Sequence, residues 1–110
     1  MLIKDRLLSH IKPLKYKNND GVYIGKYIVN LSDITFVPDS KVSVFQAIEA
    51  SITISNKYKK IVYMTFNNTP VSIPYQTNLS VIGIQHIANI YFDRLYGRIK
   101  YKRGKNVRIK

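Results

Sequence analysis

Apolar stretches separated by polar ones mark the predicted elements in the first third of the chain. In the range 2–11, Leu and Ile recur near helical spacing, which predicts a short amphipathic helix that Pro13 ends. The polar range 15–21 predicts a turn. Two runs rich in β-branched and aromatic residues follow, at 22–31 and 34–37, and each predicts a β-strand.

The middle of the chain predicts a second helix. Apolar residues in the range 44–52 recur with a helical period, so we expect a helix that ends near Ser55. Asp39 and Ser40 follow the proline that stops the preceding strand, at the place where a helix N-terminus would be capped. Ser43 and Gln46 are the alternative, because they have the spacing of a capping box, in which each side chain hydrogen-bonds the other residue's backbone N–H.

The last third repeats this order of elements. The ranges 60–66 and 71–74 predict two more strands, joined by a turn at 67–69. Thr77 or Asn78 can then cap a final helix.

This final helix, which ends at Gly97 or continues toward Tyr101, carries apolar residues on two sides. Because a helix that is apolar on two sides is usually buried on both, we expect it to be the central helix of the core or part of an oligomer interface. Self-association as a homodimer is one expected use of that surface.

These elements together predict a small single α+β domain over residues 1–98. Its order is a short helix followed by two ββα units, whose four strands form an antiparallel sheet packed by helices. The segment from Tyr27 to Pro38 aligns with the segment from Tyr63 to Pro74 at an offset of 36, which is consistent with an internal duplication and a pseudo-twofold axis. Helices on one face of such a sheet leave the other face open to a ligand or a second subunit.

Charge changes this picture from a plain domain to one with a polyanionic partner. The chain has 18 Lys and Arg against 6 Asp and Glu, giving a net charge of +12. An AT-rich genome could supply the many Lys codons, but it does not explain why Glu49 is the single glutamate. Cys is absent, which excludes disulfides and thiolate metal sites. No apolar run approaches the roughly 20 residues that a bilayer requires, so we expect no membrane contact and an intracellular location.

Basic residues are densest at the end of the chain. Residues 94–110 hold eight basic residues and no acidic one. We expect 99–110 to be a basic segment that is either flexible or an edge strand. With three lysines after the second helix, these residues form the predicted nucleic-acid-binding set: Lys57, Lys59, Lys60, Arg94, Arg98, Lys100, Tyr101, Lys102, Arg103, Lys105, Arg108 and Lys110.

No constellation in the sequence predicts catalysis. His10 and His86 lack a neighbouring nucleophile, and we expect His86 to be a partly buried, hydrogen-bonded core residue. Nothing in the spacing of the six carboxylates requires two or three of them to converge on a divalent ion, which makes a metal-dependent nuclease the weaker alternative. We therefore expect a non-enzymatic protein with no cofactor and no metal.

Nine tyrosines and no tryptophan add a second signal. Many of these tyrosines lie within a few residues of Lys or Arg, and aromatic rings among basic residues are typical of proteins that bind single strands or RNA. The sequence thus predicts a small protein that binds DNA or RNA mainly through phosphates, of a size and composition found in viruses and mobile elements. The alternative is an inhibitor or adaptor that binds an acidic partner protein through the same basic surface.

Overall fold

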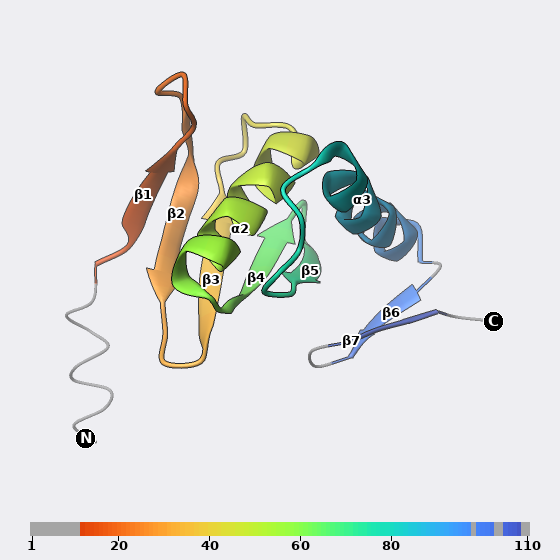
Figure 1. The fold of residues 1–110 in the computed structure, drawn as a ribbon. Helices are drawn as coiled ribbons and strands as arrows, with labels where there is room; N and C mark the ends of the chain where they lie inside the picture. The colour runs from red at the N-terminus through yellow and green to blue at the C-terminus, as the bar shows by residue number, and fades with distance from the viewer. Residues whose placement is uncertain (1–11, 98, 103–104, 109–110) are drawn as a thin grey trace.

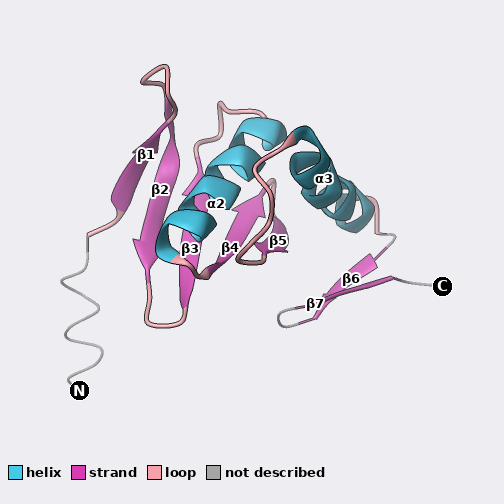
Figure 2. Ribbon diagram, in the orientation of Figure 1, coloured by secondary structure: helices cyan, strands magenta, loops and turns pink. Residues whose placement is uncertain are grey.

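The computed structural model describes residues 12–97, 99–102 and 105–108, in which two helices pack on a five-stranded mixed sheet (Figure 1 and Figure 2). This architecture confirms the α+β class. The predicted helix at 2–11 lies outside the described residues. The elements are β1 (Leu14–Lys17), β2 (Tyr23–Val29), β3 (Asp33–Pro38), α2 (Val44–Tyr58), β4 (Ile61–Phe66), β5 (Thr69–Ile73), α3 (Val81–Leu95), β6 (Ile99–Lys102) and β7 (Lys105–Arg108).

The sheet has the strand order β1-β2-β3-β4-β5 and one parallel pair. β1, β2 and β3 pair antiparallel, as do β4 and β5, but β3 and β4 run parallel. The predicted all-antiparallel sheet is therefore wrong at this pair. The reason is α2, which returns the chain to the end of the sheet where β3 began, so that the next strand starts in the same direction.

The first strand was not predicted from the sequence. Leu14 to Lys17 falls largely in the range expected to be a turn, yet it pairs with β2 as the edge strand of the sheet. The strand alternates Leu and Tyr with Lys, a period of two that its polar composition hides. Its side chains alternate between the two faces, so Lys15 and Lys17 lie on the face opposite to Leu14 and Tyr16.

The strand order does not fit a twofold duplication. In a shared sheet, a twofold axis that exchanges β2 with β4 and β3 with β5 also reverses the order of the strands. Applied to the observed order β2-β3-β4-β5, it gives β3-β2-β5-β4, so the observed sheet does not have this symmetry. The aligned tyrosines also differ, since Tyr27 is buried on the helix side and Tyr63 lies on the opposite face. The pseudo-duplication is therefore not confirmed.

Helix α2 begins with the alternative capping box, and neither Asp39 nor Ser40 is its N-cap. The Gln46 backbone N–H donates to Ser43 Oγ over 3.2 Å, and the Ser43 backbone N–H donates to Gln46 Oε1 over 3.0 Å. The helix runs to Tyr58, one turn beyond the expected end, and it ends where Lys59 adopts a left-handed conformation with φ 56°. The Lys60 backbone N–H then donates to the Ser55 carbonyl, which closes the last turn.

Replacing Ser43 with alanine is expected to lower the free energy of unfolding by about 1 kcal/mol, because the Gln46 backbone N–H at the helix start loses its acceptor, Ser43 Oγ. Urea unfolding of the variant measures this change. Ser40→Ala, in the loop before the helix, is the matched control and should have little effect. Equal destabilisation by both variants would show that the capping box is not the source.

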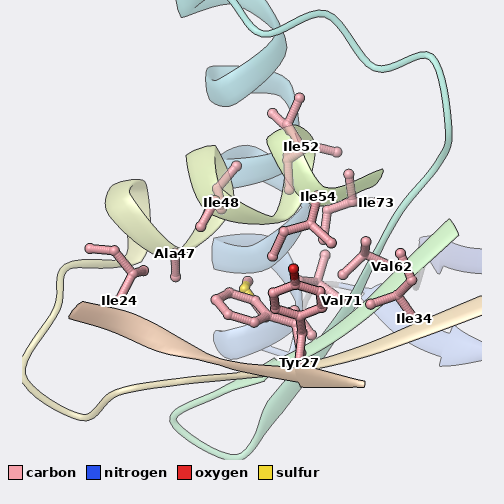
Figure 3. Close-up of a cluster of buried hydrophobic side chains, with 14 of the residues drawn as sticks. Ile24, Tyr27, Ile34, Ala47, Ile48, Ile52, Ile54, Val62, Val71 and Ile73 are labelled. Atoms are coloured by element: carbon pink, nitrogen blue, oxygen red, sulfur yellow. The ribbon is translucent and has the colours of Figure 1, made fainter. Parts of the chain in front are cut away.

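The core lies between the sheet and the two helices, which both cover the same face (Figure 1). α2 buries seven residues against the sheet and is the central helix. Figure 3 shows isoleucines and valines of α2 and the strands meeting in this layer. Gly25 is required there, because a Cβ at this position would lie 2.6 Å from the Val37 carbonyl oxygen and 2.9 Å from the Phe36 ring. The core consists of Ile24, Tyr27, Ile34, Phe36, Ala47, Ile48, Ala50, Ile52, Ile54, Val62, Met64, Val71, Ile73, Ile87 and Ala88.

Helix α3 packs beside α2 through a single buried stripe. Ser80, rather than Thr77 or Asn78, caps it by accepting from the Gly83 backbone N–H over 3.1 Å. Val81 and Ile82 at its start are more than 80% exposed. The expectation that this helix is the buried central helix is therefore wrong. Val81 and Ile82 face solvent in the single chain, whereas Ile84, Ile90 and Phe92 pack against the core, and self-association through the exposed start of α3 stays a prediction.

Candidate nucleic-acid interface

The sheet face opposite the helices is the main candidate surface. Along β3 and β4 every second side chain points away from the helices. On β2 the side chains of Tyr23, Lys26 and Ile28 do so, because a register shift between β1 and β2 interrupts the alternation at the buried Ile24. No helix of the described residues covers this face (Figure 2). It is exposed over β1 to β3 and closes toward β5, where Ser72 is buried. Exposed and half-buried residues form this open face: Lys15, Lys17, Tyr23, Lys26, Ile28, Thr35, Val37, Tyr63 and Thr65.

Three lysines gather at one end of the open face. Lys15 on β1 lies directly opposite Lys26 on β2, and Lys17 is two positions further along β1. All three side chains are exposed. They line a shallow hollow together with Tyr23 and Asp39.

No ion pair within the described residues neutralises the charge of these three lysines. Within residues 12–97, no ion pair joins Lys15, Lys17 or Lys26 to a carboxylate, although Asp39 lies in the same hollow. Like charges directly opposite each other on neighbouring strands destabilise a sheet by about 0.2–1 kcal/mol. The Lys15–Lys26 pair therefore destabilises the fold, and no ion pair within the described residues offsets this effect.

Edge protection explains only part of the cluster. Lysines on an edge strand discourage pairing with a second chain, which accounts for Lys15 and Lys17 on β1. It does not account for Lys26, because β2 is an interior strand with neighbours on both sides. Edge protection therefore leaves Lys26 unexplained.

The predicted lysines after α2 lie elsewhere and two of them make local contacts. Lys57 Nζ lies 5.4 Å from the ring centroid of Tyr58, within range of a cation–π interaction. Lys60 Nζ donates to the Asn30 carbonyl over 2.7 Å and so joins the end of α2 to the loop between β2 and β3. Lys59 is exposed and forms the left-handed helix cap. These three residues are held at the helix end and do not extend the open face.

The basic residues at the end of the chain fall on α3 and on a separate hairpin. Arg94 is half-buried in the last turn of α3. Gly97, with φ 78°, follows the helix as expected. β6 and β7 pair with each other in a two-stranded sheet, and the predicted edge strand of the main sheet is thus a hairpin of its own. Arg98, Arg103 and Lys110 lie outside the described residues.

The register of this hairpin gathers positions of like charge. Lys102 pairs with Lys105, and Lys100 pairs with Val107. Because alternate positions of a strand share a face, Lys100, Lys102 and Lys105 occupy positions on one face of the hairpin, while Tyr101 and Arg108 occupy positions on the other. The hairpin is thus a second concentration of basic residues.

Four tyrosines of the sheet and α2 differ in their surroundings: two are hydrogen-bonded to each other on the helix side, and two lie on the open face. Tyr27 on β2 and Tyr58 on α2 share a hydrogen bond of 3.1 Å between their hydroxyl groups, and their ring centroids are 5.9 Å apart. Burial, followed by this hydrogen bond, raises the pKa of Tyr27 to about 12. These two residues have a structural role. Tyr23 and Tyr63 are half-buried on the open face.

The described residues do not assemble a metal site. Among them, no three His, Asp or Glu side chains converge in a way that would hold an ion. His86 is exposed on α3, so the expected partly buried, hydrogen-bonded histidine is wrong. The reason is that α3 buries only the stripe through Gly83, Ile87 and Tyr91. None of the helices described is both long enough and apolar enough to cross a membrane.

The open face was missed because charge was judged by its density along the chain. Lys15 and Lys26 are far apart in sequence and meet only through strand pairing. The signal that could have found them is the alternation Leu-Lys-Tyr-Lys at 14–17, which predicts an edge strand with its lysines on one face. Comparison with protein-family models, with curated proteins and with solved structures finds no match for this chain.

Proposed function

We propose that this protein binds nucleic acid through phosphate contacts and has no catalytic role. The observation that carries the proposal is Lys26, an exposed lysine on an interior strand directly opposite Lys15. Such a pair lowers stability unless an external anion neutralises it. The net charge of +12 and the basic hairpin supply the long-range attraction for a polyanion.

The contact is expected to be mainly electrostatic. Arginine forms the commonest base-specific contact, and the open face carries lysine rather than arginine. Lysine is a flexible point charge, which suits phosphates in any sequence. We therefore expect little discrimination between base sequences and a strong dependence on salt.

A titration of the full chain against nucleic acid at about 50 and 200 mM salt tests this proposal. If five phosphates are neutralised, the salt slope is about −4.5 on duplex DNA and −3.5 on a single strand, so affinity should fall roughly 500-fold or 130-fold. A chain ending at Gly97 keeps all five strands of the main sheet and should retain binding with a shallower slope. No binding to any nucleic acid at the lower salt would contradict the proposal.

The alternative partner, an acidic protein, is tested in parallel. An acidic polypeptide such as poly-glutamate offers the same charge without phosphates or bases. If it binds as tightly as nucleic acid, the basic surface serves a protein. We favour nucleic acid because half-buried aromatic rings lie on the same face as the lysines.

A further inference from the structure

We infer that the open face binds single-stranded nucleic acid, with unpaired bases stacking on Tyr23 and Tyr63 and phosphates over the three lysines. This inference rests on the proposed function and names its substrate. Tyr23 lies among Lys15, Lys17 and Lys26 in the shallow hollow, so a base on its ring would place the adjoining phosphates near three ammonium groups.

Both rings are available to a ligand. Neither Tyr23 nor Tyr63 makes a hydrogen bond or a ring contact with another residue of the described chain, in contrast to Tyr27 and Tyr58. Each is half-buried, as expected for a ring that lies along the sheet and keeps one side in solvent. Such rings accept any base, because every base has a π-face.

The two tyrosines mark the ends of a diagonal path across the sheet. Tyr63 on β4 lies opposite Thr35 on β3, which lies opposite Ile28 on β2, five positions after Tyr23. Two strand spacings and five residue rises place the Cα atoms of Tyr23 and Tyr63 at most about 19 Å apart, since the register shift near Tyr23 shortens the strand. Lys26 lies on β2 between Tyr23 and Ile28. The path therefore combines charge, an apolar side chain and a hydroxyl in the span of several nucleotides.

This geometry favours a single strand over a duplex. In a duplex the bases stack on one another and present only their edges in the grooves, so a ring on a flat sheet cannot stack on them. A duplex would touch the lysines through its phosphates and gain nothing from Tyr63. A single strand can use both, and discrimination between the two substrates should therefore depend on the tyrosines.

The test compares a labelled oligothymidylate of about 12 nucleotides, an oligouridylate of the same length and a duplex of the same length, in fluorescence anisotropy at two salt concentrations. For the full chain we expect tighter binding to the single strands. Tyr63→Ala and Tyr23→Ala should each weaken single-strand binding by roughly fivefold to more than a hundredfold while leaving duplex affinity and the salt slope unchanged.

Matched variants keep this test independent of folding. Tyr63→Phe and Tyr23→Phe retain the ring and should bind like the unmodified chain, while Tyr75→Ala removes an exposed tyrosine outside the path and should have no effect. If Tyr63→Ala and Tyr23→Ala weaken duplex and single-strand binding equally, or change neither, the single-strand inference is wrong and the proposed function stands. Absence of binding to every nucleic acid overturns both.

Discussion

Replacing Lys26 with glutamate is expected to move stability and binding in opposite directions. The glutamate would lie directly opposite Lys15, so a repulsive cross-strand pair becomes an attractive one. That change should raise the free energy of unfolding by about 0.2–1 kcal/mol. Affinity for nucleic acid should fall roughly tenfold to a hundredfold, because a charged contact contributes about 1.5–3 kcal/mol.

Opposite signs distinguish a binding residue from a structural one. Substituting a surface lysine that only packs against its neighbours would lower the free energy of unfolding. It would weaken binding only through the change in the net charge of the protein. The measurements are urea unfolding without nucleic acid and an anisotropy titration at about 50 mM salt. The salt slope should also become shallower by about 1, since one phosphate contact is lost.

Lys57→Glu is the matched control because it makes the same change of charge on α2, on the other side of the molecule. Lys57 lies near the C-terminus of the helix, where a negative side chain is unfavourable, so this variant should lose stability slightly. Its effect on binding should be small. If Lys57→Glu weakens binding as much as Lys26→Glu, nucleic acid is attracted by the overall positive charge of the protein and the open face is not the site.

Much of the fold could be predicted because its signals are local. The capping box of Ser43 and Gln46 lies within four consecutive residues, and of the two predicted caps it is the one that begins α2. Asn67 and Asn68 both adopt left-handed backbone conformations, as the tight turn between β4 and β5 requires. In each case a short stretch of sequence contains both the residue and its hydrogen-bonding or conformational reason.

The parts that were missed depend on which elements meet. The parallel pairing of β3 and β4 is decided by the path of α2 across the sheet, and nothing in either strand indicates it. Val81 and Ile82 suggested a buried helix, yet burial depends on what packs against α3, and its neighbour α2 contacts one side only. Hydrophobicity predicts that a surface prefers to be covered, but it does not supply the element that covers it.

The candidate site shows the same limit. Runs of basic residues at 57–60 and 94–110 stand out in the sequence, and the structure places them on a helix end, α3 and a hairpin. The open face brings together lysines that no run contains. This grouping of lysines follows only from the register of β1 against β2. Charge density along a chain thus does not show which basic residues the fold brings together.

The Tyr27–Tyr58 pair makes stability depend on alkaline pH. Tyr27 is 6% exposed on β2, and its hydroxyl hydrogen-bonds that of Tyr58 at the end of α2. Burial and the hydrogen bond raise its pKa to about 12, compared with about 10 in the unfolded chain. The raised pKa means that the folded state holds its proton more tightly. The stabilisation is therefore complete below pH 10 and is lost as pH rises toward 12.

Raising the pKa from about 10 to about 12 corresponds to a loss of roughly 3 kcal/mol of stability across this window. Tyr27→Phe removes the titrating group, so its free energy of unfolding should fall less steeply than that of the unmodified chain between pH 10 and 12. Near neutral pH the variant should be less stable by about 1 kcal/mol, because Tyr58 loses its partner. Urea unfolding at several pH values gives both curves.

The difference between the two curves isolates Tyr27 from the other tyrosines and lysines that titrate in the same range, because those groups are common to both chains. Tyr75→Phe, at an exposed position, is the control and should leave the slope unchanged. Curves for Tyr27→Phe and the unmodified chain that cross in this window would support the shifted titration. Parallel curves would mean that Tyr27 titrates normally, and that the hydrogen bond between β2 and α2 does not hold its proton.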